Sequence, residues 1–367
     1  MEIIAFYLPQ YHPTPHNNEW WGEGFTEWTN VAKAKPLFPG HYQPKIPADL
    51  GFYDLRMPEV KEKQALLAKE AGITGFCYYH YWFGNGQQEL ELPFNQVVES
   101  GKPNFPFCLC WANESWYRKF WNKDGNVADK QDLAIQTYPG ADDNIKHFLS
   151  LKKAFSDNRY IRINGKLLFV IYKPLLFEGV EDFMAQWRSL AKEHGLGDFF
   201  FAAYTTDISN DRTRIEKLGF DSIISCRIRR YKKRGVKWLT RKIISYLTNT
   251  TERYNYKKVY PTLIGEEEKQ ENIYPTLVPN WDHTPRSGNH GYLFTNSTPE
   301  LFEKHVENVL YEVKRKERNN QICFLKSWNE WGEGNYVEPD LKYGKGYLNA
   351  IKTAIKKVYH NENPADK

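Results

Sequence analysis

Two glutamates whose spacing suits catalysis, Glu330 and Glu333, lie in the segment 327–336, which reads SWNEWGEGNY and follows the apolar run 322–325. Two carboxyl groups held close together cannot both ionise cheaply, so one pKa rises and supplies a general acid while the other group stays anionic. Carboxylate pairs carry out glycoside chemistry, and tryptophan faces bind sugar rings. The segment therefore predicts a catalytic pair in a carbohydrate site, and the alternative is two solvated loop carboxylates.

The elements that must position this pair are short apolar runs that alternate with helical patterns. Runs typical of strands occur at 3–8, 73–79, 105–111, 167–172, 199–204, 221–225, 274–279 and 322–326. Helical patterns occur at 58–71, 92–100, 142–155, 181–194, 211–218, 299–316 and 347–359. The run at 274–279 is the weakest, because proline is poorly tolerated inside a paired strand.

The apolar patterning of these runs is continuous rather than alternating, which indicates parallel strands that are buried on both faces. Eight such strands, most followed by a helix, predict an α/β fold of the (β/α)8 barrel type. No G-x-G-x-x-G loop follows the first strand, which argues against a doubly wound nucleotide-binding fold. We expect one catalytic domain over residues 1–367, with long strand–helix loops and a basic insertion at about 227–272.

The residues just after each predicted strand are the candidates for the site, because barrel active sites lie at the C-terminal strand ends. Aromatic, amide, histidine and carboxylate side chains gather there. The predicted substrate-binding set is Gln10, Tyr11, His12, Trp28, His80, Tyr81, Trp82, Trp111, Asn113, Glu114, Tyr172, Tyr204, Trp281, Asp282, Trp328, Asn329 and Trp331. The structural alternatives are core tryptophans, structural histidines and an ion pair of Glu114 with Arg118. Asp282 and His283 lack a third clear ligand, so we predict neither a metal site nor a cofactor.

The composition narrows the class of partner. The aromatic content of 16% suits a carbohydrate site or a large core equally well, and the net charge of +5 implies no nucleic-acid partner. No basic leader precedes the first apolar run, and no run approaches the roughly 20 residues of a membrane-spanning helix. The five cysteines, an odd number, lie in or beside apolar runs and read as reduced core thiols. These features favour a cytoplasmic protein.

A basic stretch at 227–242 contains no acidic residue. One interpretation is a surface that attracts an acidic glycan, a lipid-linked glycan or an anionic membrane, which would make the protein membrane-peripheral. The other interpretation is a solvated helix face within the insertion. The sequence leaves both open.

The chain contains several long motifs, AFYLPQYHP at 5–13, NEWWGEGFTEWTNV at 18–31, GFCYYHYWF at 75–83, WANE at 111–114 and WNEWGEG at 328–334. These motifs resemble those of the WbsX family. The resemblance covers nearly the whole chain. That family is found in polysaccharide and O-antigen loci and is labelled glycosyltransferase. It is similar to glycoside hydrolase family 99, the endo-α-mannosidases and endo-α-mannanases.

The resemblance to family 99 implies a (β/α)8 barrel and a retaining mechanism. One glutamate deprotonates the sugar 2-hydroxyl, which attacks C1 and gives a 1,2-anhydro sugar. The other protonates the leaving oxygen and then activates the incoming nucleophile. Carried over by motif, Glu330 is the implied base and Glu333 the implied acid/base, whereas the usual retaining route uses direct carboxylate attack on C1. Gly332 departs from the family 99 motif, which carries a bulkier residue there.

Three hypotheses follow. The first is a retaining enzyme, hydrolytic or transglycosylating, that acts on glycosidic bonds of a bacterial polysaccharide. The second is a glycosyltransferase of O-antigen or capsule assembly, although neither a nucleotide-binding loop nor a D-x-D-type motif supports a nucleotide-sugar donor. The third is a non-catalytic glycan-binding barrel, against which the intact glutamate pair argues.

Overall fold

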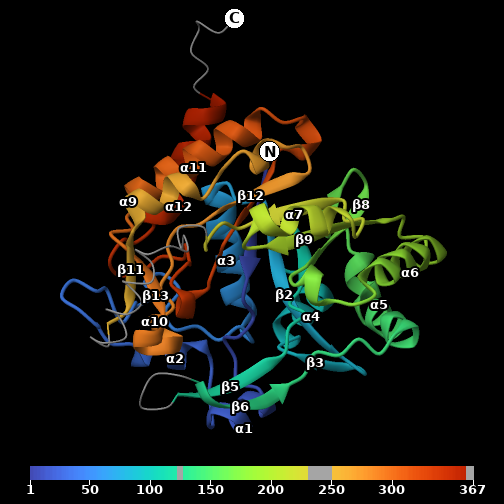
Figure 1. Ribbon diagram of the computed structural model, residues 1–367, viewed down its shortest axis with the longest axis horizontal. Coiled ribbons are helices and arrows are strands. Elements are labelled where there is room, and N and C mark those ends of the chain that lie inside the picture. Colours follow the sequence, from blue (N-terminus) through green and yellow to red (C-terminus); the bar gives the residue numbers. More distant parts are fainter. Residues whose placement is uncertain (122–126, 230–249, 361–367) are drawn as a thin grey trace, which may run out of the picture.

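Eight parallel strands form a closed barrel at the centre of the computed structural model (Figure 1), which describes residues 1–121, 127–229 and 250–360. Strand β1 pairs with both β2 and β14, and this closes the ring. The predicted (β/α)8 barrel is confirmed. The strands are β1 (Glu2–Tyr7), β2 (Gly75–Gly84), β4 (Phe107–Trp111), β8 (Lys166–Ile171), β9 (Phe199–Thr205), β10 (Ser222–Ser225), β12 (Ile273–Leu277) and β14 (Ile322–Leu325).

The barrel strands are buried along almost their whole length, as the continuous apolar runs predict. The run predicted at 274–279 forms β12 despite its proline. Pro275 lies opposite Ser225 in the ladder with β10, and the pairing with β14 begins one residue later, at Thr276. The strand thus tolerates a residue that weakened its prediction.

Helices surround the barrel, with α5 and α6 on one flank and α11 and α12 on another (Figure 1). Thr298 caps α11 as its position predicts, because its side chain accepts a hydrogen bond from the Leu301 amide at 3.4 Å. The seven predicted helices all form, with ends shifted by a few residues. Their bounds are α3 (Pro58–Ala71), α4 (Leu92–Ser100), α5 (Ala141–Phe155), α6 (Val180–Glu193), α7 (Ile208–Glu216), α11 (Pro299–Lys314) and α12 (Gly346–Ile355).

Short helices and strands form in segments that were expected to be loops around the barrel. Several gather at the lower end of Figure 1, opposite the N-terminus, namely α1 (Pro15–Trp21), α2 (Glu27–Lys33), β5 (Trp116–Trp121), β6 (Val127–Ala134) and α10 (Thr284–Ser287). The others are β3 (Gln87–Glu89), β7 (Arg162–Ile163), β11 (Glu252–Asn255), α9 (Tyr256–Val259) and β13 (Tyr292–Thr295), with 3-10 turns at Pro174–Leu176, Tyr260–Thr262, Glu267–Lys269, Gly288–His290, Arg318–Asn320 and Trp331–Glu333 and a π-helical turn at Lys356–His360. Each of the five elements of the first group contributes residues to the larger cavity of the site described below.

The predicted basic insertion lies between β10 and β12, and its residues 230–249, which include most of the basic stretch, fall outside the described residues. Arg227, the first residue of that stretch, is buried. Its guanidinium bonds Glu267 and also Glu268, the latter at 2.5 Å. Arg227 therefore belongs to an internal ion-pair network and not to a basic surface. Within the described ranges, no helix is both long and apolar enough to cross a membrane.

Candidate active site

The segment after β14 is held in place by hydrogen bonds to its own backbone and to the end of β1. Asn329 Oδ1 accepts from the Leu8 amide at 2.8 Å, and Asn329 Nδ2 donates to the Leu8 carbonyl at 3.0 Å. The Glu330 amide donates to Ser327 Oγ at 2.9 Å, and the 3-10 turn Trp331–Glu333 follows. The two predicted catalytic glutamates therefore lie on a turn that is fixed at the rim of the barrel.

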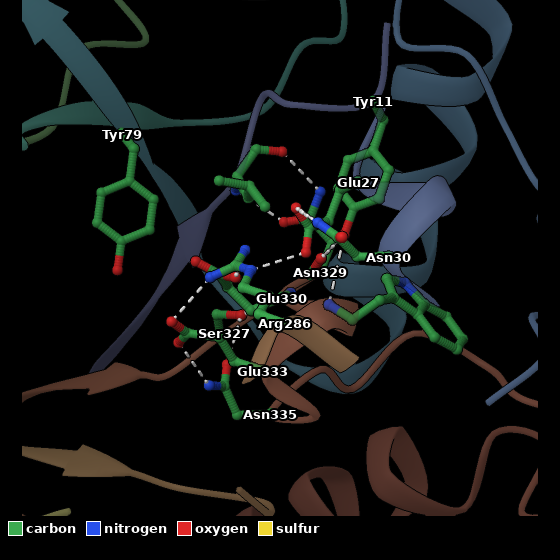
Figure 2. A network of polar contacts seen from close by, with 12 residues as sticks. Tyr11, Glu27, Asn30, Tyr79, Arg286, Ser327, Asn329, Glu330, Glu333 and Asn335 are labelled. Carbon is green, nitrogen blue, oxygen red and sulfur yellow. Dashed lines mark hydrogen bonds and ion pairs between the residues drawn. The ribbon is translucent and has the colours of Figure 1, made fainter. Parts of the chain in front are cut away.

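The guanidinium of Arg286 lies between three carboxylates (Figure 2). Its nitrogens contact Glu333 Oε1 at 2.9 Å, Glu330 Oε2 at 3.1 Å and Glu27 Oε1 at 2.8 Å. Arg286 comes from α10 and Glu27 from α2, so three separate loops of the barrel mouth meet at this one cation. Only a quarter of the Arg286 side chain is exposed. The acid pair is thus bridged by a fork of hydrogen-bond donors whose geometry suits carboxylates.

A second cation, Lys326, stands beside Glu333 at the end of β14. Its Nζ lies 3.7 Å from Glu333 Oε2 and donates a hydrogen bond to the Tyr79 hydroxyl at 2.8 Å. Asn335 Nδ2 donates to the same glutamate oxygen at 3.3 Å. Glu333 is therefore surrounded by donors on both oxygens, whereas Glu330 has one oxygen on Arg286.

These surroundings move the two pKa values apart. Burial raises the pKa of Glu330 to about 7, and the neighbouring charge of Glu333 adds to this shift. Burial acts in the same direction on Glu333, but Lys326 and Arg286 outweigh it and hold the pKa of Glu333 well below its usual range. Glu330 therefore keeps its proton up to about neutral pH, whereas Glu333 is ionised there.

Two adjoining cavities open around the pair. The smaller, of about 180 Å³, is lined by both glutamates, Lys326 and three tyrosines. The larger, of about 850 Å³, lies within the size range of ligand pockets and carries Trp21 and Phe25 on its wall. The two cavities share the lining residues Gln10, Glu114, Trp116 and Arg286. A polar floor with aromatic walls suits a sugar chain whose reacting bond lies over the glutamates.

The structure brings part of the predicted set to these cavities. Gln10, Tyr81, Glu114 and Tyr172 line the smaller cavity together with both glutamates, and Asn113 lines the larger. Glu114 pairs with Lys173 at 3.3 Å. The structure places the remaining predicted residues outside both linings, namely Tyr11, His12, Trp28, His80, Trp82, Trp111, Tyr204, Trp281, Asp282, Trp328, Asn329 and Trp331.

Most of these tryptophans are buried, and their indole N–H groups donate hydrogen bonds to backbone or carboxylate oxygens. Trp111 donates to the Trp82 carbonyl at 2.9 Å, and Trp82 donates to Asp143 at 2.9 Å. Trp331 stacks on Tyr336 with ring centroids 3.7 Å apart. Their rings therefore belong to the packed interior of the protein.

The two predicted histidines are also buried. His80 Nε2 faces His147 Nε2 at 2.8 Å, and burial lowers the pKa of His80 to about 3. His12 Nδ1 lies 3.1 Å from the Pro9 carbonyl, and burial lowers its pKa as well. Both rings are therefore neutral groups of the interior.

Asp282, considered above with His283 as a pair, accepts hydrogen bonds from its own surroundings. Its Oδ2 accepts from Gln43 at 2.7 Å and faces His41 Nε2 at 2.9 Å, while its Oδ1 accepts from the Thr284 hydroxyl at 2.6 Å. In the described part of the chain, no cluster of three or more His, Cys, Asp or Glu side chains is arranged to hold a metal ion.

Sequence reasoning missed the cations Arg286 and Lys326 and the carboxylate Glu27. One signal was present, namely the glycine at position 332. A Cβ on Gly332 would lie 1.7 Å from Glu27 Oε1, so the absence of a side chain makes room for this carboxylate. The departure from the family 99 motif is therefore coupled to the Glu27–Arg286 ion pair.

A parallel eight-stranded barrel with a buried acid pair at the C-terminal ends of its strands has the architecture of a barrel enzyme. The chain belongs to the family described as glycosyltransferase WbsX, whose model matches residues 3–351. It is 33% identical over 354 residues to the uncharacterized protein WxcX of Xanthomonas campestris pv. campestris, in strains B100 and ATCC 33913. The match covers 96% of this chain and 49% of each relative, so the chain spans about half their length.

Solved structures share the fold at low sequence identity. The GH99 endo-α-mannosidase of Bacteroides thetaiotaomicron, in complex with bis-tris-propane, superposes with a TM-score of 0.58 at 15% identity, covering 98% of this chain and 97% of that one. A protein described as glycoside hydrolase-like gives a TM-score of 0.56 at 14% identity, with 96% and 93% covered. The resemblance to the WbsX family and the family 99 fold is confirmed.

Proposed function

We propose that this chain is a carbohydrate-active enzyme that breaks a glycosidic bond of a bacterial polysaccharide with retention, using Glu330 and Glu333. The observation that carries the proposal is the buried acid pair at the floor of the two adjoining cavities, with its pKa values moved in opposite directions. One proton shared between two carboxyl groups is what an acid and a base need to act on one bond. Membership of the WbsX family supports a glycan as the substrate.

A direct test is the release of reducing sugar from a panel of α-mannans and bacterial surface polysaccharides. We expect Glu333→Gln to lower the rate by about a hundredfold or more while glycan binding is retained. Glu70→Gln, an exposed change on α3, is the matched control and leaves the rate unchanged. Activity on no glycan, combined with consumption of a nucleotide-sugar, would overturn the proposal.

An assay that changes the leaving group of the substrate and the nucleophile can separate the roles of the two glutamates. In the proposed reaction the sugar O2 bonds to C1 as its proton passes to one carboxylate, and the C1–O bond breaks as the other carboxyl protonates the leaving oxygen. The resemblance makes Glu330 the base and Glu333 the acid, whereas burial raises the pKa of Glu330 and favours the proton there.

A glycosyl fluoride needs no acid, and azide as nucleophile needs no base. With this pair of reagents, Glu333→Gln keeps most of its rate if Glu333 is the acid, while Glu330→Gln stays inactive. The opposite pattern would assign the acid role to Glu330.

Transfer to a sugar is the second candidate, and the description of the family as glycosyltransferase favours it. The same acid/base pair would activate an acceptor hydroxyl in place of water. The larger cavity, about 850 Å³ in volume, has room for an acceptor beside the donor. Products longer than the substrate, formed at the expense of reducing sugar when acceptor oligosaccharides are added, would identify a transferase. Unchanged hydrolysis products would identify a hydrolase.

A further inference from the structure

A third cavity, of about 520 Å³, lies on the other side of the turn that carries the catalytic pair, and we call it the Lys45 cavity. It shares no lining residue with the two cavities described above. Its wall includes Gly334, the residue after Glu333, and Asp282, whose amide donates to the Glu333 carbonyl at 2.7 Å. The proposed reaction uses none of its side chains.

The ammonium of Lys45 lines this cavity and is 4% exposed. It finds no hydrogen-bond acceptor among the described residues, and its nearest carboxylate oxygen, Asp282 Oδ2, is 3.8 Å away. That oxygen already accepts from Gln43 and faces His41. A buried ammonium without an acceptor is costly unless a ligand supplies one.

Glycine at position 334 makes space for this ammonium. A Cβ on Gly334 would lie 2.2 Å from Lys45 Nζ, and the φ of +64° is the left-handed conformation that glycine adopts readily. The turn that positions the catalytic pair on one face therefore also opens a place for a cation on the other. The Lys45 ammonium fits its wall closely at this glycine.

The remaining charged groups of the cavity also favour an anion. Arg253 and Lys342 are two further cations on its lining, and Asp340 is the second carboxylate after Asp282. Both oxygens of the Asp340 carboxylate already accept hydrogen bonds, one from the Tyr336 hydroxyl and one from the Tyr343 amide, both at 2.6 Å. Both carboxylates of the cavity therefore accept hydrogen bonds already, whereas the Lys45 ammonium donates none to any described residue.

Aromatic rings form much of the rest of the lining. Phe38, Tyr336, Tyr343 and Tyr347 belong to it, and the Arg253 guanidinium stacks 4.5 Å from the Phe38 ring centroid. Rings of this kind pack against the C–H faces of sugars. Aromatic faces beside a buried ammonium that donates no hydrogen bond within the described part of the chain suit a charged sugar.

We propose that the Lys45 cavity binds a sugar unit that carries a carboxylate or phosphate, with the oxyanion accepting hydrogen bonds from Lys45 Nζ and the sugar ring lying on the aromatic wall. The identification of the ligand as a sugar rests on the proposed function, whereas the requirement for an anion comes from the cavity. The site is a second glycan-binding site, separate from the catalytic cleft, and it selects an acidic unit of a polymer.

Titration calorimetry of the full chain with D-glucuronate, glucose 6-phosphate and glucose tests this proposal. We expect one of the two anions to bind at least about tenfold more tightly than glucose, and the preferred anion tells carboxylate from phosphate. Lys45→Met should weaken that binding by about tenfold or more, and Lys342→Gln, an exposed change, by about threefold. Glu333→Gln should bind the anion as the wild type does, because it lies in the other site.

Equal binding of glucose and both anions, or no binding of either anion, would overturn the proposal. So would unchanged binding in Lys45→Met and Lys342→Gln together, and the second variant decides alone if the first fails to fold. Loss of anion binding in Glu333→Gln would place the ligand in the catalytic cleft instead. None of these results depends on turnover, so a failure of the proposed reaction is seen separately, in the sugar-release assay.

Discussion

The buried cations on the two sides of the turn after β14 differ in how many hydrogen-bond partners they have. On the catalytic side, Arg286 contacts three carboxylates within 3.1 Å, and the pair of glutamates is held before any substrate arrives. On the other side, the Lys45 ammonium has a single carboxylate at 3.8 Å, and that carboxylate is already satisfied by other donors. A cation that is fully hydrogen-bonded positions the reacting groups, whereas an ammonium that donates no hydrogen bond to the described residues has donors left for a ligand.

The sharpest way to break this comparison is to remove the cation on the catalytic side. Arg286→Met leaves three carboxylates close together without their partner, so we expect a loss of roughly 3–5 kcal/mol in the free energy of unfolding near pH 7. Urea denaturation measures this loss. Arg286→Lys keeps the charge but not the planar fork and should lose less.

The pH dependence of that loss follows from the shifted pKa of Glu333. Its folded pKa is depressed, so in the wild type Glu333 contributes stability above its unfolded pKa of about 4.3, and this is lost as pH falls toward the folded value. Without Arg286 this contribution shrinks, so the variant and the wild type should differ less at pH 4 than at pH 7. A difference that stays constant over this range would show that Arg286 acts through packing.

The barrel and the acid pair were predictable from the sequence because both are local signals. A strand buried on both faces is a continuous apolar run, and Glu330 and Glu333 follow such a run within one turn. The barrel then brings distant strand ends together, which is why Gln10, Tyr81 and Tyr172 meet the pair without any signal in their spacing.

The ion pairs that Arg286 forms with Glu27 and with the two catalytic glutamates were not predictable in this way. Glu27 and Arg286 stand 259 positions apart, and both lie in short helices within loops rather than at strand ends. The prediction that most of the tryptophans line the substrate site failed for a different reason. Residue type does not tell which side of a strand end an indole occupies, and Trp111 and Trp328 point into the core.

A substitution with a smaller expected effect tests whether Gly332 makes room for the Glu27 carboxylate that pairs with Arg286. Gly332→Ala places a methyl group where Glu27 Oε1 now lies, so we expect a loss of about 1–3 kcal/mol in stability. In a Glu27→Ala background the same change should cost less, because the clashing carboxylate is gone. Urea denaturation of the four proteins of this cycle measures the coupling. Strictly additive losses would separate Gly332 from Glu27.

The smallest expected effect comes from replacing the cation on the other side of the turn with methionine. Lys45→Met keeps the length of the side chain and removes an ammonium that lacks an acceptor, while Asp282 retains its bonds to Gln43 and Thr284. The lost attraction at 3.8 Å is offset by the relief of burying a charge, so stability should change by about 1 kcal/mol or less in either direction.

The anion found by calorimetry sharpens this last test. It should raise the melting temperature of the wild type more than that of Lys45→Met, because a ligand stabilises the state that binds it. A loss in Lys45→Met as large as that in Arg286→Met would mean that the protein itself already stabilises the ammonium. The two sides of the turn would then follow one rule, and the Lys45 cavity would have no need of a ligand.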